Sequence, residues 1–146
     1  IDLKYITARG NWYHTSWKGD IHKSGGIATN IGIHFFDALL WIFGDVKESI
    51  IHQHDRDMAS GKLRLEKADI SWMLSIDENQ LPEEIKKTGS RTYRSLVIGG
   101  ETIEFSNGFE ELHTKAYENI LAGNAIDLAE TKKVIQLLHD VRNPGK

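Results

Sequence analysis

The sequence contains no cysteine and only two prolines in 146 residues. Without cysteine, disulfides, thiolate metal ligands and cysteine nucleophiles are excluded, which suits a reducing, cytoplasmic compartment. No apolar run reaches the length of about 18 residues that a membrane helix needs, so we expect no membrane contact. The formal net charge is −3, from 18 Lys and Arg against 21 Asp and Glu. A nucleic-acid-binding protein is usually basic, so nucleic acid is not an expected partner.

Glycine-rich phosphate turns are also missing, although the chain has 13 glycines. Neither G-x-G-x-x-G nor G-x-x-x-x-G-K-[ST] occurs, and the pairs Gly25-Gly26 and Gly99-Gly100 fit neither spacing. Such turns let the backbone approach the phosphates of a nucleotide. We therefore expect no cofactor-binding residue here. The chain opens at Ile1 directly on strand-like residues, and we expect it to be one domain of a longer protein.

Hydrophobic periodicity predicts an α+β fold with an open, mainly antiparallel mixed sheet and helices packed on one face. Strands are expected at residues 1–7, 46–54, 63–66, 68–76, 91–98 and 101–105. Helices are expected at residues 27–43, 82–88, 112–122 and 128–141, with Asp127 as an N-cap, and residues 8–26 are expected to form a loop. Trp72 and its neighbours suggest an uncovered sheet face too apolar for water, which a partner subunit would cover.

A polar stripe of Asn30, His34 and Asp37 follows the predicted helix 27–43 at helical spacing. The side chains of Asn30 and His34 lie one turn apart and can meet. An adjacent amide or carboxylate can hold a histidine in one tautomer, ready to donate or accept a proton. The alternative is a histidine that merely satisfies its hydrogen bonds at a helix–sheet junction.

Cationic side chains are interleaved with aromatic ones in two segments, a pattern that suits an anionic, sugar-like ligand. The candidates are Arg9, Tyr13, Lys18, Arg91, Tyr93 and Arg94. The alternative is a solvated loop and a solvated strand face. His52 and His54 favour a charged edge strand over a metal site, so no metal ligand is expected. His14 and His22 are expected to face water.

Residues 24–44, SGGIATNIGIHFFDALLWIFG, resemble the helix that opens the C-terminal domain of the Gfo/Idh/MocA oxidoreductases. The family pattern is a tryptophan with a basic residue, Gly-Gly, and then Asp/Asn-x-Gly-x-His-x-x-Asp. The matching positions are Trp17-Lys18, Gly25-Gly26, Asn30, Gly32, His34 and Asp37. The resemblance extends over the whole chain, including the closing segment 117–138.

The resemblance implies a two-domain enzyme whose N-terminal Rossmann domain binds NAD and supplies a catalytic lysine. Residues 1–146 would be the C-terminal substrate-binding and oligomerisation domain, inactive alone and forming a homo-oligomer through its open sheet face. Residues 7–20, TARGNWYHTSWKGD, are most similar to members that oxidise the 3-hydroxyl of UDP-linked N-acetylated uronic acids for surface polysaccharides such as lipopolysaccharide. Alternatives are another sugar or cyclitol dehydrogenase of the family, or a non-catalytic assembly or sugar-binding module.

By the same resemblance, His34 would sit beside the sugar carbon that loses hydride and would assist proton transfer. Asn30 stands where many members have Asp, and an amide can orient His34 but cannot stabilise its charged form. Arg9, Tyr13 and Lys18 would position the substrate. Arg91, Tyr93 and Arg94 would contact the same ligand or serve the subunit interface instead.

Overall fold

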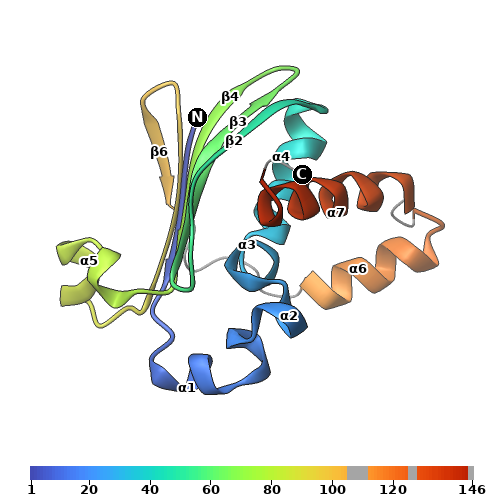
Figure 1. Ribbon diagram of the computed structural model, residues 1–146. Coiled ribbons are helices and arrows are strands. Elements are labelled where there is room, and N and C mark those ends of the chain that lie inside the picture. Colours follow the sequence, from blue (N-terminus) through green and yellow to red (C-terminus); the bar gives the residue numbers. More distant parts are fainter. Residues whose placement is uncertain (105–111, 125–127, 145–146) are drawn as a thin grey trace.

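The computed structural model describes residues 1–104, 112–124 and 128–144, which form a six-stranded sheet and a layer of helices (Figure 1). The strands are β1 (Asp2–Thr7), β2 (Val46–His54), β3 (Met58–Leu65), β4 (Asp69–Ser75), β5 (Thr92–Ile98) and β6 (Glu101–Glu104). Their order in the sheet is β2-β3-β4-β1-β5-β6. β1 pairs with β4 in parallel, and the other neighbouring pairs are antiparallel. The predicted α+β fold with an open, mainly antiparallel sheet is confirmed.

A layer of helices lies on one face of this sheet (Figure 1). The helices are α1 (Asn11–Thr15), α2 (Ile21–Ser24), α3 (Gly26–Asn30), α4 (Ile33–Phe43), α5 (Glu83–Lys87), α6 (Leu112–Leu121) and α7 (Leu128–Arg142). Two 3-10 turns, η1 (Trp17–Gly19) and η2 (Glu78–Gln80), complete the list. α3 and α4 lie against the sheet, and α7 packs on both of them and on β2 (Figure 1). None of the helices within these ranges is both long and apolar enough to span a membrane.

The core lies between the sheet and this helical layer. The Phe36 ring of α4 meets the Trp72 ring of β4 edge-on, with ring centroids 5.2 Å apart. Leu3, Leu74 and Val141 are almost fully buried in the same cluster. Alternation along β4 therefore sends its apolar side chains toward the helices, as a half-buried strand requires.

The expectation that Trp72 makes the uncovered sheet face apolar is wrong. Trp72 and its face-mates Ile70 and Leu74 are covered by the helices. The opposite face of β3 and β4 carries polar and charged residues. The register of the two strands places Lys62 beside Ser71 and Arg64 beside Asp69. The strand was identified correctly, but a period of two does not say which face meets the helices.

A second, smaller hydrophobic cluster occupies one end of that opposite face. Leu81 and Ile85, from the segment that carries η2 and α5, pack with Ile6, Met73 and Tyr93. Figure 1 accordingly draws α5 on the other side of the sheet from α3, α4 and α7. The rest of this face carries no helix within the described residues.

Two predicted elements differ in extent from the structure. Strand β3 begins at Met58, five residues before the predicted start at position 63. Ala59 and Gly61 are too small to produce the alternation of large apolar residues that marks a strand. The structure nevertheless requires a small residue at position 61. A Cβ at Gly61 would collide with the Ile50 carbonyl oxygen and would lie 2.9 Å from the Trp72 ring.

The segment predicted as a loop, residues 8–26, contains the short helices α1, η1 and α2. These short helices end and begin within a few residues, so no amphipathic period marks them in the sequence. The hairpin at Gly99-Gly100 forms as predicted, with positive φ at both glycines. The predicted strand end at Phe105 and the predicted N-cap Asp127 lie outside the described residues.

The predicted single helix 27–43 is wrong because the chain breaks between α3 and α4, at Ile31 and Gly32. A Cβ on Gly32 would lie 2.5 Å from the Ala28 carbonyl oxygen and 2.6 Å from Leu74 Cδ1. The backbone at Gly32 thus touches the sheet directly, which only a residue without a side chain permits. As a result, Asn30 and His34 belong to different helices.

Replacing Gly32 by alanine should destabilise the fold by about 1–3 kcal/mol, because the added methyl group has no space between Ala28 and Leu74. The free energy of unfolding, measured by urea titration, checks this. The control is Gly99→Asn, where no atom lies within 4 Å of the added Cβ and asparagine tolerates positive φ. The control should stay within about 0.5 kcal/mol of the parent. Equal stability of Gly32→Ala and the parent would contradict the close approach.

Candidate functional site

The candidate site begins where β1 ends and the chain enters the segment from Arg9 to Lys18. This segment carries α1 and η1 and lies beyond one end of the sheet (Figure 1). The segment starts with a turn at Gly10, whose φ is 67°. Glycine adopts a positive φ at little cost in free energy because it has no Cβ. The segment therefore leaves the sheet sharply and returns toward the helical layer.

Tyr13 fixes the segment to α3. Its side chain is buried, and its hydroxyl accepts a hydrogen bond of 3.0 Å from Asn30 Nδ2. The same Asn30 amide donates to the Lys18 carbonyl oxygen at 3.2 Å. One amide at the end of α3 thus holds the segment at two points, in α1 and in η1.

The Tyr13 phenol stays protonated at neutral pH. Burial raises the pKa of Tyr13, and the hydrogen bond from Asn30 and the charge of Arg9 only partly oppose that rise. A neutral hydroxyl that already accepts from Asn30 keeps its own proton free to donate to a ligand oxygen.

The two predicted cations of this segment precede and follow Tyr13 in the sequence. Arg9 Nε is buried and has no hydrogen-bond partner among the described residues. A buried guanidinium nitrogen without a partner is costly, and an anionic oxygen of a ligand would relieve that cost. The Lys18 ammonium lies 5.8 Å from the centre of the Trp17 ring, and that ring is exposed. The structure therefore places Arg9 near Tyr13 and ties both Tyr13 and the Lys18 backbone to Asn30.

His34 lies in a different setting, on the exposed side of the first turn of α4. It lines a cavity of about 620 Å³ between α4 and α7, shared with Asp37, Trp41 and Lys133. It also lines a smaller apolar cavity of about 140 Å³ with Phe35. No hydrogen bond joins Asn30 to His34 in the described parts of the chain, because the break at Gly32 separates the two helices and Asn30 donates to Tyr13 and Lys18 instead.

The three candidates at and before the start of β5 fall in different places. Arg91 reaches back to the end of β1, where its Nε donates to the Ala8 carbonyl oxygen at 3.4 Å. Arg94 lies on the helix-covered face, with its guanidinium 5.0 Å from the centre of the Tyr5 ring. Tyr93 is on the opposite face, in the small cluster with Leu81. Arg91 thus joins the neighbourhood of Arg9, Arg94 lies on the same sheet face as α4, and Tyr93 is separated from both.

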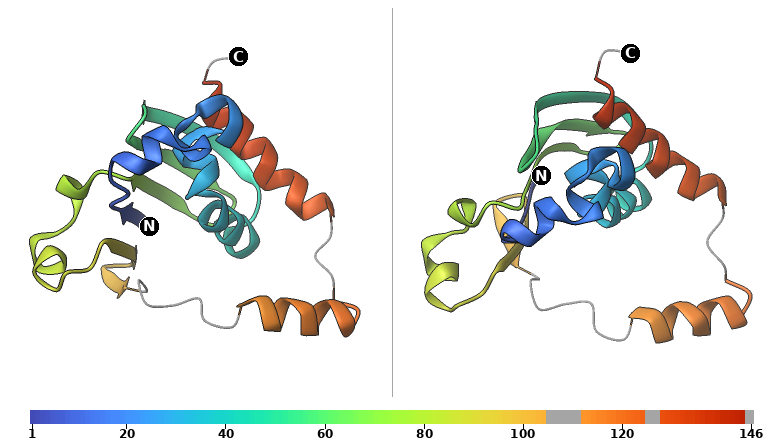
Figure 2. Two further views of the ribbon diagram at one scale, coloured as in Figure 1. Left: turned by 90° about the horizontal axis from the view of Figure 1, so that it is seen from below. Right: turned by 60° about the horizontal axis from the view of Figure 1, so that its bottom comes forward.

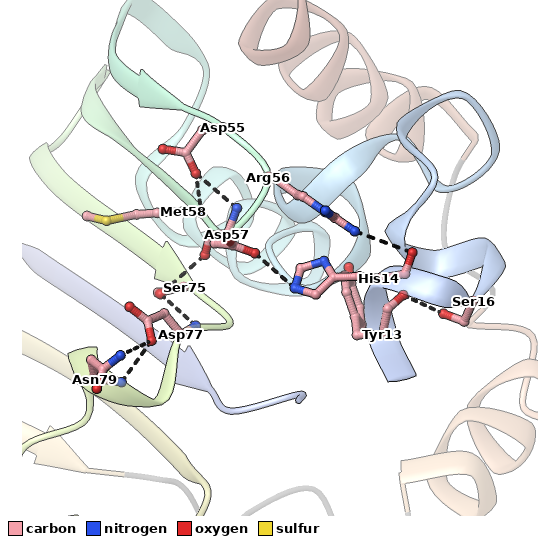
Figure 3. A network of polar contacts seen from close by, with 10 residues as sticks. All are labelled: Tyr13, His14, Ser16, Asp55, Arg56, Asp57, Met58, Ser75, Asp77 and Asn79. Atoms are coloured by element: carbon pink, nitrogen blue, oxygen red, sulfur yellow. Dashed lines mark hydrogen bonds and ion pairs between the residues drawn. The ribbon is translucent and has the colours of Figure 1, made fainter. Parts of the chain in front are cut away.

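Three residues near the site were missed or misjudged from the sequence. His14, expected to face water, is three-quarters covered, and its Nε2 lies 3.2 Å from Asp57 Oδ1. Arg56 Nη2 donates to the His14 carbonyl oxygen at 3.5 Å (Figure 3). No signal in the sequence links positions more than 40 residues apart, so these contacts required the fold.

The histidines of β2 lie on a strand at the edge of the sheet, as predicted. Among the residues that the structure describes, no group of three or more His, Asp or Glu side chains could hold a metal ion. His54 Nε2 is instead buried near Gly26, at the start of α3.

Comparisons with known proteins agree with this architecture. The family model for the C-terminal alpha/beta domain of the Gfo/Idh/MocA oxidoreductase family matches residues 1–80. A WlbA (WbpB) dehydrogenase from Thermus thermophilus, solved with NAD and alpha-ketoglutarate, is 46% identical, with a TM-score of 0.94 over 98% of this chain. The same dehydrogenase solved with NAD and UDP-GlcNAcA gives 46% identity and a TM-score of 0.92 over 97% of this chain.

The chain spans 46% of the length of each Thermus thermophilus structure. A dehydrogenase from Clostridium difficile is only 14% identical, with a TM-score of 0.52 over 98% of this chain and 54% of its own, and shows the fold alone. Because the family model covers more than half of the 146 residues, and the 46% identity extends over nearly all of them, the chain belongs to the Gfo/Idh/MocA oxidoreductase family, whose C-terminal alpha/beta domain it matches.

Proposed function

We propose that this chain is the substrate-binding domain of an NAD-dependent dehydrogenase that oxidises the 3-hydroxyl of a UDP-linked N-acetylated uronic acid. The observation that carries the proposal is 46% identity over 97% of the chain to a dehydrogenase crystallised with NAD and UDP-GlcNAcA. The product would serve bacterial surface-polysaccharide synthesis, such as that of lipopolysaccharide. The absence of cysteine suits the cytoplasm as the place of reaction.

The residues of this chain do not fit an NAD site. Neither dinucleotide-binding glycine pattern occurs in it, and the Gly25-Gly26 pair leads into α3, a helix of only five residues. We assign NAD, which accepts hydride in such dehydrogenases, to a Rossmann domain in the remaining half of the relatives' length. The catalytic lysine that the family resemblance implies would lie in the same domain.

This partner domain would also account for an apolar surface on α6. Tyr117, Ile120 and Leu121 are all more than half exposed, and Leu128, at the start of α7, is 83% exposed. Figure 2 shows α6 standing away from the sheet. Apolar side chains gathered in this way mark an interaction surface, and the Rossmann domain is the partner we assign to it.

Arg9, Tyr13 and Lys18 supply what binding of such a substrate requires. A uronate carboxylate and a diphosphate are both anionic, and the guanidinium and ammonium groups can take them. The Tyr13 hydroxyl, oriented by Asn30 at 3.0 Å, would donate to a sugar oxygen. We add Arg91 to this group because its guanidinium lies beside Gly10.

We assign to His34 a hydrogen bond to the reacting hydroxyl, through which it would help to hold or move the hydroxyl proton. Its exposure at the start of α4 leaves the ring free to reach a substrate. Asn30 would hold Tyr13 and the Lys18 backbone in place. Its role would therefore be to shape the substrate site and not to orient His34. Arg94, on the face that α4 covers, would contact the same ligand.

We propose a homo-oligomer formed through the open sheet face. That face exposes Ile50, and its charges at Glu48, Arg64 and Asp69 already pair with one another at 3.0 and 3.2 Å. Pre-paired charges lower the cost of removing them from water at a contact. Tyr93, on the same face, would then serve the interface.

Replacing His34 by alanine in the complete enzyme should lower turnover of the UDP-linked uronic acid by about 100-fold or more, because a proton-transferring group is lost. The initial rate of NADH formation measures this. His22→Ala is the matched control, since His22 is an exposed histidine whose side chain lies outside the proposed site, and its rate should equal that of the parent. Near-normal turnover of His34→Ala would contradict the role given to His34.

The 146-residue chain alone should bind no NAD, because it contains no phosphate turn. Isothermal titration calorimetry with NAD checks this, and circular dichroism confirms that the sample is folded. NAD binding by the folded chain at micromolar concentration would overturn the assignment of the cofactor to the other domain.

A further inference from the structure

The turn between β2 and β3 reaches across to α1 and touches His14 (Figure 3). Asp57 Oδ1 lies 3.2 Å from His14 Nε2, and Arg56 Nη2 donates to the His14 carbonyl oxygen at 3.5 Å. One residue of α1 is therefore held through both its ring and its backbone. We call these contacts of His14, Arg56 and Asp57 the latch.

The turn side of the latch is a fixed part of the sheet. The Asp55 carboxylate accepts hydrogen bonds of 2.9 Å from the backbone N–H groups of both Asp57 and Met58. The Asp57 carbonyl oxygen accepts from Ile76 N at 2.9 Å and from Ser75 Oγ at 3.2 Å. The Asp57 backbone is thus tied to its own turn and to the end of β4, and its carboxylate has little freedom to move away.

The α1 side, in contrast, has few anchors of its own. A five-residue helix is too short to be stable alone, and it follows a turn at Gly10. Trp12 and Trp17 are more than half exposed and fix nothing in the core. Consecutive residues provide the two attachments: Tyr13 binds Asn30 on α3, and His14 binds the β2–β3 turn.

We propose that the latch holds residues 9–18 in the geometry that binds substrate, so that His14, Arg56 and Asp57 are positioning residues for Arg9, Tyr13 and Lys18. This inference rests on the proposed function. If the segment is ordered only part of the time, apparent substrate affinity falls by the fraction that is competent. Loss of the latch weakens ground-state and transition-state binding equally, which raises KM and leaves kcat unchanged.

Arg56 and Asp57, which are distant in the sequence from the substrate-binding segment, would thereby control substrate affinity without contacting the substrate. Asp57 is half exposed, so its contact with His14 alone resembles an ordinary surface pair of small effect. The latch differs because the His14 ring is largely covered, its Nδ1 is buried without a partner among the described residues, and Arg56 binds the same residue. A covered ring held at one nitrogen and at its carbonyl has few other positions to adopt.

The first experiment measures order in the segment directly, by hydrogen–deuterium exchange of peptides covering residues 10–24 in the complete protein. His14→Asn and Asp57→Asn should raise the exchange rate of these peptides about threefold to tenfold. In His14→Gln the side-chain amide can reach the position of Nε2 and donate to Asp57, so exchange should return toward the parent rate. Asp77→Asn is the matched control, because the Asp77 carboxylate accepts hydrogen bonds from Asn79 within its own turn, and the peptides should then exchange like the parent.

The second experiment measures KM and kcat of the same variants. His14→Asn and Asp57→Asn should raise KM for the UDP-linked uronic acid about threefold to tenfold, with kcat and the KM for NAD within about twofold of the parent. His14→Gln should restore KM. A purely structural pair would instead lower the melting temperature and leave KM unchanged.

Unchanged exchange of residues 10–24 in His14→Asn and Asp57→Asn would overturn the latch. Faster exchange with an unchanged KM would overturn its role in substrate binding. Failure of the parent protein to turn over any UDP-linked uronic acid would refute the proposed function, and the exchange rates would then decide by themselves whether the latch orders the segment.

Discussion

The close approach of the backbone at Gly32 to the sheet is the constraint on which the helical layer and the candidate site both depend. Without a Cβ at this position, the chain passes against Leu74 and breaks into two helices. After the break, α4 directs Phe36 onto Trp72 in the core. Before it, α3 ends with the Asn30 amide turned to Tyr13. The close approach at Gly32 thus lies at the point where the two helices, and the contacts that they make, separate.

Most of the fold was predictable because each element buries one face, and burial leaves a period in the sequence. Strand β4, whose burial alternates along its length, and the Gly99-Gly100 hairpin are examples in which the pattern and the structure agree. The failures share a cause. The break at Gly32 and the early start of β3 at Gly61 depend on atoms of distant strands that exclude a side chain. The sequence shows that these positions are glycine, but it does not show which neighbouring atoms exclude a larger side chain.

The sequence suggested candidate residues for the site but not their arrangement. The Asn30 amide donates to the Tyr13 hydroxyl and to the Lys18 carbonyl oxygen, and not to His34. The family pattern identifies positions, and it does not give the angle between the two helices that carry them. The contact between His14 and Asp57 had no signal at all, because it joins a loop to a turn 43 positions later.

In the proposed substrate site, the hydrogen bond between Asn30 and Tyr13 holds the substrate-binding segment in place. A double-mutant cycle with Tyr13→Phe and Asn30→Ala measures the contribution of this bond to binding. The measured quantity is the dissociation constant of the complete enzyme for the UDP-linked uronic acid, by calorimetry. We predict that each variant weakens binding and that the two effects are coupled by about 0.5–3 kcal/mol, as expected for residues in contact. Additive effects, with no coupling energy, would show that substrate binding does not depend on the hydrogen bond between Asn30 and Tyr13.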